Sequence, residues 1–376
     1  MIVNSIFADG YKNLKQVNIT LDPKMNIICG ENAQGKTNLI EAVWLCSGCR
    51  SFRGTKDKDM ICFDGDVSRV SVNFENFYRM ENIEFILKKG TVKEKTITLN
   101  GIKNDRLSKL FEEFKCVVFT PEDLNITKGS PDNRRNFLDI AISQIKPSYI
   151  NALKKYNGIL QQRNSLLKSM SAVQGSDTKY LDVWNEQLAE AGAFISVLRY
   201  NYCKTLNEQA NRLYNLITDS KENLQIYYQS TIYDDLEGET DVKNKLADIY
   251  IQKLKDTAEN DKKMGYTGAG VHRDDMHAFV NDISLRDFGS QGQSRSAALA
   301  LKLAHAKILK AEQGEYPVML LDDVLSELDS TRQKFILNNI DDMQVIITCC
   351  DSRPITDLRD GKVFTVENGR IGSGEF

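Results

Sequence analysis

A glycine-rich loop close to the start of the sequence constrains the fold of this chain more than any other feature. It matches the pattern G-x-x-x-x-G-K-[ST] through the consecutive residues Gly30, Glu31, Asn32, Ala33, Gln34, Gly35, Lys36 and Thr37. A short apolar run from Met25 to Cys29 precedes the loop, and Leu39, Ile40 and Val43 follow it at helical spacing. Strand, loop and helix in this order are the context in which the pattern binds phosphates, so the sequence predicts an α/β fold built around a phosphate loop.

The residue types of this loop indicate a site for ATP and Mg²⁺. Glycines allow main-chain N–H groups to wrap the phosphates, and the start of the following helix adds a partial positive charge. Lys36 is expected to reach the β and γ phosphates, and Thr37 to ligate Mg²⁺. The expected ATP-binding segment runs from Gly30 to Asn38. A chance glycine turn before a helix is the alternative.

A pair of acids after a second apolar run supports the nucleotide site. The run Val318 to Leu321 is typical of a buried strand, and Asp322 and Asp323 follow it directly. P-loop ATPases use such a pair to hold Mg²⁺ and to orient the attacking water, so Asp322 is expected at the metal and Asp323 at the water. Acids at a strand end can also begin a loop or cap a helix, but the phosphate loop favours catalysis.

The organisation of the chain indicates two lobes. Its 376 residues exceed what one hydrophobic core usually serves. Alternating apolar residues predict strands through Val70 to Phe74 and Ile83 to Leu87, and Asn100-Gly101 is a hairpin turn signal. A long helix is expected from about Gln293 to Glu312.

Two helical seams lie in the middle of the chain and predict an antiparallel helical hairpin. The first steps through Ile150, Leu153, Asn157, Leu160, Asn164 and Leu167, and the second through Leu181, Trp184, Leu188, Ala191, Ile195, Leu198 and Tyr202. A polar stretch from Ser171 to Thr178 suits the turn between them. Packing in an ordinary bundle remains the alternative.

Composition excludes several functions. Only Cys46 and Cys49 have metal-ligand spacing, so the eight cysteines are expected to be free, reduced thiols. No stretch approaches the ~20 apolar residues of a membrane span, so a cytoplasmic protein without membrane partners is expected. The formal charge of -3 means that any DNA surface must be a local basic patch.

Four further segments have recognisable patterns, namely Pro121 to Leu124, Gly270 to Asp275, Phe288 to Arg295 and Ser326 to Asp329. Together with the phosphate loop, this set resembles the branch of the ABC-type ATPases that contains the SMC proteins and the RecF family. The resemblance implies an ABC-type ATPase head, with a mixed sheet and flanking helices, that is interrupted by an inserted helical, coiled-coil-like domain. We place the head in residues 1–125 and 263–376 and the inserted domain in 126–262.

The resemblance also implies residue roles. The ABC signature, which touches the nucleotide held by the other subunit, would comprise Ser290, Gln291, Gly292 and Gln293. Ser326 and Asp329 would lie in a loop that crosses the dimer interface, and Glu122 would sense Mg²⁺ and the attacking water beside the catalytic residues Lys36 and Asp323. ATP would therefore close a homodimer around two nucleotides. For Ser290 to Gln293 a helix cap, and for His272 to Asp275 a surface turn, are the simpler alternatives.

The sequence departs from most ABC ATPases at two places. Asp323 stands where most of them have Glu, although RecF-type proteins resemble this chain there, and Ile347-Thr348-Cys349-Cys350 has no switch histidine. A shorter acid and no histidine predict slow hydrolysis that suits a timed switch.

DNA binding is expected from the resemblance and from local basic residues, among which Arg50, Arg53, Lys56, Arg134 and Arg135 are the candidates for phosphate contacts. RecF-type proteins imply action on single-stranded DNA and gapped or junction duplexes in repair and replication, with recombination mediators, recombinase loading and SOS induction. Hydrolysis would be weak and DNA-stimulated.

Three other functions fit the sequence less well. An SMC-like, DNA-bridging ATPase would need longer arms than this hairpin, which extends ~30 Å at 1.5 Å per residue. A transporter subunit would bind membrane partners and ignore DNA. A GTPase is disfavoured because Asn244-Lys245-Leu246-Ala247-Asp248 places the aspartate one position too late for N-K-x-D.

Overall fold

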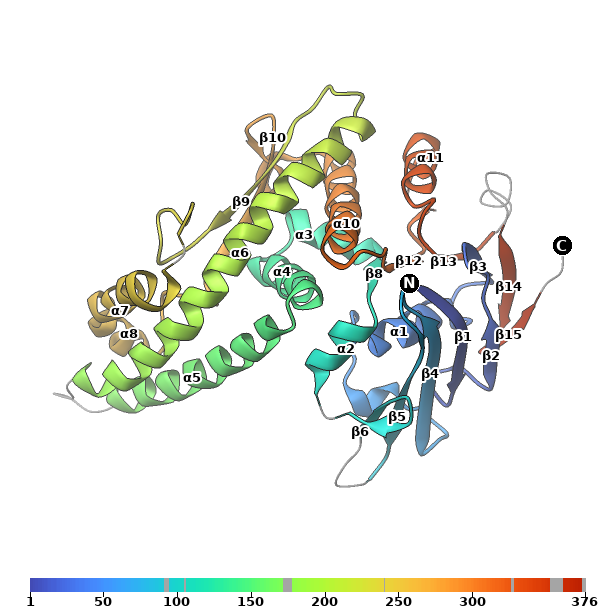
Figure 1. Ribbon diagram of the computed structural model, residues 1–376, viewed down its shortest axis with the longest axis horizontal. Helices are drawn as coiled ribbons and strands as arrows, with labels where there is room; N and C mark the ends of the chain where they lie inside the picture. The colour runs from blue at the N-terminus through green and yellow to red at the C-terminus, as the bar shows by residue number, and fades with distance from the viewer. Residues whose placement is uncertain are drawn as a thin grey trace. The chain divides into compact units, whose positions relative to one another are not determined.

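The computed structural model describes residues 1–90, 95–104, 106–171, 178–239, 241–325, 328–351 and 361–373 (Figure 1). The chain folds as two compact units, one formed by residues 1–123 and 298–376 and the other by residues 124–297.

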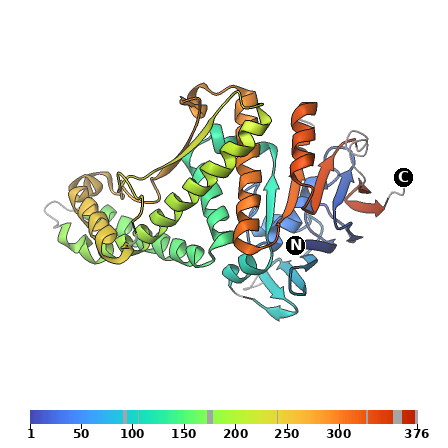
Figure 2. The same ribbon diagram turned by 45° about the horizontal axis from the view of Figure 1, so that its top comes forward.

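A mostly parallel sheet carries the phosphate loop in the first unit. Its strand order is β15-β14-β3-β13-β12-β8, with β15 antiparallel at one edge and the others parallel. Its strands lie side by side in both ribbon views (Figure 1 and Figure 2). The bounds are Met25–Cys29 for β3, Cys116–Phe119 for β8, Val318–Asp322 for β12, Val345–Cys349 for β13, Lys362–Glu367 for β14 and Arg370–Ser373 for β15.

An antiparallel sheet in the order β2-β1-β4-β5-β6-β7 completes this unit. The predicted strands are confirmed in β4 and β5, and the Asn100-Gly101 turn joins β6 to β7 with both residues at positive φ, as a tight hairpin requires. The bounds are Ile2–Asp9 for β1, Val17–Thr20 for β2, Val67–Glu75 for β4, Met80–Lys88 for β5, Lys95–Leu99 for β6 and Ile102–Lys103 for β7.

Helix α1, Lys36–Cys46, is buried on nearly all sides because it packs against strands of both sheets. It follows β3 and the phosphate loop directly, so the predicted order of strand, loop and helix is confirmed. The unit also contains α2 (Leu107–Glu113), the short 3-10 helices Asp57–Met60 and Pro121–Leu124, and α11 (Ser330–Asn339).

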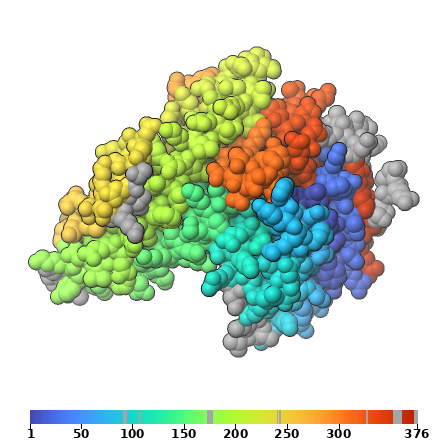
Figure 3. All heavy atoms as spheres, in the orientation of Figure 1, coloured from blue at the N-terminus to red at the C-terminus, as the bar shows by residue number. Residues whose placement is uncertain are grey.

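The second unit is mainly helical. Its small sheet has the strand order β11-β10-β9. The side chains of α6, yellow-green in Figure 3, form a large part of the face of this unit that is seen there. The bounds are Asn125–Lys128 for α3, Pro131–Ile145 for α4, Ser148–Ser171 for α5, Asp182–Ile217 for α6, Ala247–Asp256 for α7, Ala258–Met264 for α8 and Leu285–Phe288 for α9, with Leu224–Gln229 for β9, Asp275–Val280 for β10 and Ile283–Ser284 for β11. A 3-10 turn at Thr178–Leu181 and a π-helical turn at Val242–Leu246 complete it, and α10 (Gln291–Gln313) begins in this unit and continues into the first.

The predicted helical hairpin consists of α5 and α6. The two helices are antiparallel. Arg163 of α5 contacts Asn185 of α6, and Lys155, earlier in α5, contacts Glu190, later in α6. Helix α6 has 36 residues, more than the seam predicted, because it continues along β9. The polar stretch 172–177 expected at the turn lies outside the described residues.

The seam predicted on α5 is wrong by about one residue. Asn157 is exposed, whereas the buried side of the helix consists of Tyr149, Tyr156, Ile159, Arg163, Leu167 and Met170. The spacing of apolar residues did not predict this buried side, because the side also contains polar residues whose buried groups are hydrogen-bonded. Arg163 donates to Asn185 and Thr267 and pairs with Asp261 at 2.8 Å, with both charged side chains buried.

The segment 263–297, which the sequence analysis placed with the head, packs in the second unit. The reason is strand pairing, since β10 pairs along its whole length with β9, from Asp275 opposite Gln229 to Val280 opposite Leu224.

The buried pair of Arg163 and Asp261 leads to a prediction about stability. Asp261→Asn should lower the free energy of unfolding by about 3–5 kcal/mol, because it leaves an uncompensated buried charge. Urea denaturation followed by circular dichroism measures the effect. Glu259→Gln, on the exposed side of the same helix, is the matched control, and equal stability of the two variants would contradict a structural role for the pair.

Candidate functional site

The proposed catalytic residues lie close together at the carboxyl ends of the parallel strands. Cys29 is the register partner of Cys349, and Thr348 that of Asp322. The phosphate loop therefore begins beside the end of β13, and the acids at the end of β12 lie one strand further on. Ligands of parallel α/β sheets bind at this edge.

The phosphate loop has the backbone conformation that its glycines permit. Gly35, immediately before α1, has φ +118°, and an added Cβ there would lie 2.8 Å from Asn13 Oδ1. A Cβ on Gly30 would lie 2.5 Å from the carbonyl oxygen of Val366. Ala33 adopts a positive φ of 65° without being a glycine. Gly30 is thus required by its close approach to the main chain, and Gly35 by its left-handed backbone.

Lys36 directs its ammonium group back over the loop. Its Nζ donates to the carbonyl oxygens of Gly30 and Glu31, the latter at 2.9 Å, and lies 3.6 Å from the Sγ of Cys350. The side chain is largely buried. A largely buried cation held over the loop by two carbonyl oxygens is suited to bind phosphate oxygens.

Thr37 and Asp322 lie together although 285 positions separate them in the sequence. Thr37 Oγ1 donates to Asp322 Oδ1 at 3.0 Å, and Thr348 Oγ1 donates to the same oxygen at 2.7 Å. The main-chain N–H of Asp323 donates in turn to Thr348 Oγ1 at 2.9 Å. These hydroxyl and carboxylate oxygens are the hard donors that Mg²⁺ prefers, and phosphates and waters usually supply its remaining ligands.

Burial also affects the ionisation of Asp322. The residue is 5% exposed, and burial raises the pKa of its carboxyl group above the ordinary value, against the opposing effect of the hydrogen bonds from Thr348 and Thr37. A buried carboxylate of this kind gains from a neighbouring divalent cation.

Sequence reasoning missed a polar chain that connects the phosphate loop to residues 50–55. Arg53 donates to Asn38 Oδ1 at 2.9 Å, Asn38 donates to Asn13 at 2.7 Å, and Asn13 donates to the Ala33 carbonyl oxygen at 3.2 Å. Arg53 therefore lies beside the phosphate loop. The hydrophobic periodicity of the sequence does not predict that Arg53 lies near a loop about twenty residues earlier.

A buried acid in α1 holds the same segment in place. Glu41 accepts hydrogen bonds from Tyr11 at 2.9 Å, from Lys12 and from Ser51, and it is fully buried. Because Ser51 Oγ also accepts the N–H groups of Arg53 and Thr55, Glu41 fixes the turn that presents Arg53. The position of Glu41 in the sequence does not indicate this role.

Glu122 lies at the same edge of the sheet. Phe119 pairs with Leu321, so Thr120 and the turn after it continue beside Asp322 and Asp323. Asp123, rather than Glu122, holds this turn, because it accepts the Thr120 N–H at 2.8 Å and pairs with Lys302 at 2.8 Å. Glu122 is exposed.

The signature residues form the start of α10 in the second unit. Ser290 Oγ accepts the N–H of Gln293 at 3.1 Å, and Gln293 Oε1 accepts the N–H of Ser290 at 2.9 Å. This reciprocal pair is a capping box, so the simpler interpretation as a helix cap describes the local geometry. Gln293 also donates to Glu222 at 2.7 Å. Ser290 and Gln291 are exposed, and Gly292 is half-buried.

Of the two residues expected in the interface loop, Asp329 lies within the described residues. Asp329 caps α11 by accepting the N–H groups of Thr331 at 3.1 Å and Arg332 at 3.0 Å. Ser326 lies outside the described residues.

In the segment His272 to Asp275 both aspartates are buried and only Arg273 is exposed, so its interpretation as a surface turn is wrong. Asp274 is fully buried and accepts hydrogen bonds from Tyr228 and from Thr231, and Arg199 donates to the Val271 carbonyl oxygen at 2.6 Å. Gly270 has φ +132°, and a Cβ there would lie 2.3 Å from the hydroxyl oxygen of Tyr250.

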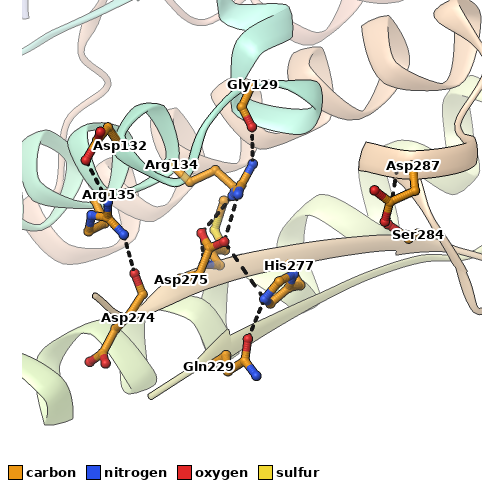
Figure 4. A network of polar contacts seen from close by, with 11 residues as sticks. Gly129, Asp132, Arg134, Arg135, Gln229, Asp274, Asp275, His277, Ser284 and Asp287 are labelled. Atoms are coloured by element: carbon orange, nitrogen blue, oxygen red, sulfur yellow. Dashed lines mark hydrogen bonds and ion pairs between the residues drawn. The ribbon is translucent and has the colours of Figure 1, made fainter. Parts of the chain in front are cut away.

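The basic candidates differ in their surroundings. Arg50, Arg53 and Lys56 are exposed. Figure 4 shows the Arg134 guanidinium directed at Asp275, to which it donates two hydrogen bonds of 2.7 Å, and at the Gly129 carbonyl oxygen. With Arg134 2% exposed, its assignment as a DNA contact is wrong, because its charge is used inside the unit.

The two neighbouring arginines differ in how far their charges are used inside the unit. Burial would raise the pKa of Asp275, but the hydrogen bond and charge of Arg134 outweigh this effect, and the pKa lies below the ordinary value. Arg135 reaches the Asp274 carbonyl oxygen and Asp132, and is partly buried (Figure 4).

The described residues contain no group of three or more histidine, cysteine, aspartate or glutamate side chains arranged to hold a metal ion. Within the same residues, no helix is long and apolar enough to span a membrane.

The fold and the site define a P-loop protein of the ABC-ATPase type, and the family model for the RecF/RecN/SMC N-terminal domain matches residues 2–371. The DNA replication and repair protein RecF of Alkaliphilus oremlandii is 39% identical over 373 residues, which cover 99% of this chain and 100% of that protein. RecF of Halothermothrix orenii is 40% identical over 374 residues, with 99% and 98% covered. The chain belongs to the RecF family of DNA replication and repair proteins, which confirms the resemblance seen in the sequence.

Solved structures agree with the fold. The structure of the recombination mediator protein RecF with ATP in the RecFOR pathway superposes with a TM-score of 0.90 at 35% identity and covers 100% of this chain and 98% of that one. An SMC head domain from Pyrococcus furiosus matches with a TM-score of 0.56 at 15% identity, which supports the fold alone. The predicted ABC-type ATPase fold is confirmed.

The raised pKa of Asp322 leads to a prediction. A carboxyl group whose folded pKa is raised destabilises the fold once pH rises past its unfolded pKa, so at pH 7 its ionised form is unfavourable. Asp322→Asn should therefore unfold at an equal or higher temperature while losing Mg²⁺-dependent ATP hydrolysis.

Differential scanning fluorimetry and phosphate release measure the two effects. Asp64→Asn, an exposed position, is the control and should change neither. A large fall in melting temperature for Asp322→Asn without nucleotide would contradict the argument from burial.

Proposed function

We propose that this chain is an ATP-dependent DNA-binding switch that binds ATP through residues 30–38 and hydrolyses it slowly. The observation that carries the proposal is the hydrogen-bonded set of Thr37, Asp322 and Thr348 beside the buried ammonium of Lys36. In a P-loop site, a cation for the phosphates and oxygen donors for a metal must lie next to each other. The RecF structure solved with ATP supports the choice of nucleotide.

The residues divide the work of hydrolysis. Lys36 and the loop N–H groups hold the phosphates, and Thr37 and Asp322 would hold Mg²⁺, which neutralises charge on the phosphates when bound. Asp323 would orient the attacking water, and Glu122, which follows the adjacent strand β8, would be the second acid. The short Asp323 side chain and the lack of a switch histidine in residues 347–350 favour slow turnover.

The proposal includes an ATP-dependent homodimer. Ser290, Gln291, Gly292 and Gln293 would contact the nucleotide of the other subunit, with Ser326 and Asp329 in the interface loop. Ser290 and Gln291 are exposed, and they begin a helix of 23 residues whose N-terminus favours an anion. Residues 1–123 and 298–376 would be the ATPase head, and 124–297 the helical arm.

We further propose that the dimer binds single-stranded DNA and gapped or junction duplexes, and that it acts with recombination mediators in recombinase loading and SOS induction. The RecF name of its relatives and the RecFOR pathway of the solved structures support this role. Arg50, Arg53 and Lys56 are the candidate phosphate contacts, with Arg135 as a weaker one. DNA would stimulate the weak ATPase.

An SMC-like bridging function is the second candidate. It is disfavoured because α5 has 24 residues, which extend only ~36 Å at 1.5 Å per residue.

The dimer is tested with two variants. Lys36→Met should weaken ATP binding roughly 100-fold, since it removes charge-assisted hydrogen bonds, and should abolish ATP-driven dimerisation. Ser290→Arg should still bind ATP but remain monomeric. Sedimentation velocity with and without ATP gives the oligomeric state, and a fluorescent ATP analogue gives the affinity. A Ser290→Arg protein that dimerises normally would refute the sandwich of two subunits.

The DNA surface is tested by salt dependence. Arg50→Gln combined with Lys56→Gln should weaken binding of all sequences equally and reduce the slope of log K against log salt by about one to two. Fluorescence anisotropy with labelled gapped DNA measures both. Lys263→Gln, an exposed lysine of α8, is the control. An unchanged slope in the double variant would place the DNA elsewhere.

A further inference from the structure

Three thiols meet at the edge of the sheet that carries the phosphate loop. Cys29 ends β3, Cys349 ends β13 as its register partner, and Cys350 follows immediately. The Sγ of Cys29 donates to the Cys350 carbonyl oxygen at 3.2 Å. The nucleotide chemistry proposed above uses none of them.

Cys350 contacts the machinery of the phosphate loop directly. Its Sγ lies 3.6 Å from Lys36 Nζ, and its thiol donates to Asn32 Oδ1 at 3.3 Å. The sulfur therefore lies against the cation that is proposed to hold the phosphates. A group attached to this sulfur would also compete with phosphate oxygens for Lys36.

The remaining thiols are less suited to react. All eight cysteines lie in the described ranges, and Cys350 is the exposed one, whereas Cys29 and Cys62 are half-buried. Burial raises the pKa of Cys46, Cys49 and Cys203 to about 12. Burial and the adjacent Cys29 do the same to Cys349. A buried thiol of this kind is inert, so reagents are directed to Cys350.

We propose that Cys350 is a modification site through which low-molecular-weight disulfides reversibly switch off the ATP site. The sulfur of Cys350 attacks one sulfur of the reagent, a new S–S bond forms to Cys350, the old S–S bond breaks, and the leaving thiolate takes up the proton. A reducing thiol reverses the exchange and releases the loop. The inference rests on the proposed ATP binding and adds a regulator to that same site.

The geometry makes the modification and the nucleotide mutually exclusive. Phosphates held by Lys36 would cover the Cys350 sulfur, and a bulky adduct on that sulfur would displace them. ATP should therefore protect Cys350, and the adduct should weaken ATP binding. Reciprocal effects of this kind follow from competition for one site.

The experiment treats the full-length protein with glutathione disulfide, with and without saturating ATP and Mg²⁺. Peptide mass spectrometry locates the adduct, and a fluorescent ATP analogue measures binding before treatment, after it, and after dithiothreitol. The first adduct should form on Cys350, ATP should slow its formation, and the adduct should weaken ATP binding about tenfold or more, with recovery on reduction.

Two variants complete the test, each compared with itself before and after treatment. ATP binding by Cys350→Ser should not change on treatment, whereas Cys62→Ser, which removes a half-buried thiol, should respond as the parent does. Full modification of Cys350 with unchanged ATP binding would overturn the inference, and so would modification that begins at another thiol. If the untreated protein bound no ATP, the proposed function would fail instead.

Discussion

The parallel pairing of β3, β13 and β12 is the constraint on which the site depends. Main-chain hydrogen bonds fix the register, and the register places Thr348 opposite Asp322 and Cys349 opposite Cys29. The hydroxyl of Thr37 can reach Asp322 only because these ends are level. Residues from the first and last quarters of the chain thus form one hydrogen-bonded group, and a slip of one residue in a strand would separate them.

Buried arginines play the corresponding part in the helical unit. Arg134, Arg163 and Arg199 are each at most 2% exposed. Each is paired with a carboxylate from another element of the unit, namely Asp275, Asp261 and Asp139. A buried ion pair contributes little net stability, but an unpaired buried charge is costly, so these pairs disfavour alternative packings of the helices. In this unit polar contacts, as well as apolar area, select the arrangement.

The parts of this structure that follow local rules could be predicted from the sequence. The phosphate loop between a strand and a helix, the alternating strands β4 and β5, and the Asn100-Gly101 turn depend on neighbouring residues, and they are confirmed. The family resemblance could also be found, because its motifs are short and contiguous.

What could not be predicted depends on distant partners. The buried side of α5 was misplaced because Arg163 and Tyr156 look like surface residues until Asp261 and His272 are known to face them. Arg134 was taken for a DNA contact for the same reason, since only the fold shows that Asp275 binds it. Glu41 and Asn13, which shape the loop around Arg53, belong to no motif.

The left-handed backbone at Asp323, with φ of 52°, limits which residues this position can hold. Short side chains such as aspartate and asparagine tolerate this conformation better than longer ones, which pay roughly 1–2 kcal/mol for it. A glutamate introduced here would therefore bear a conformational cost while it gained reach. Replacing the acid by a longer one would therefore require the turn after β12 to change as well. The backbone of this turn and the length of its acid are thus constrained together.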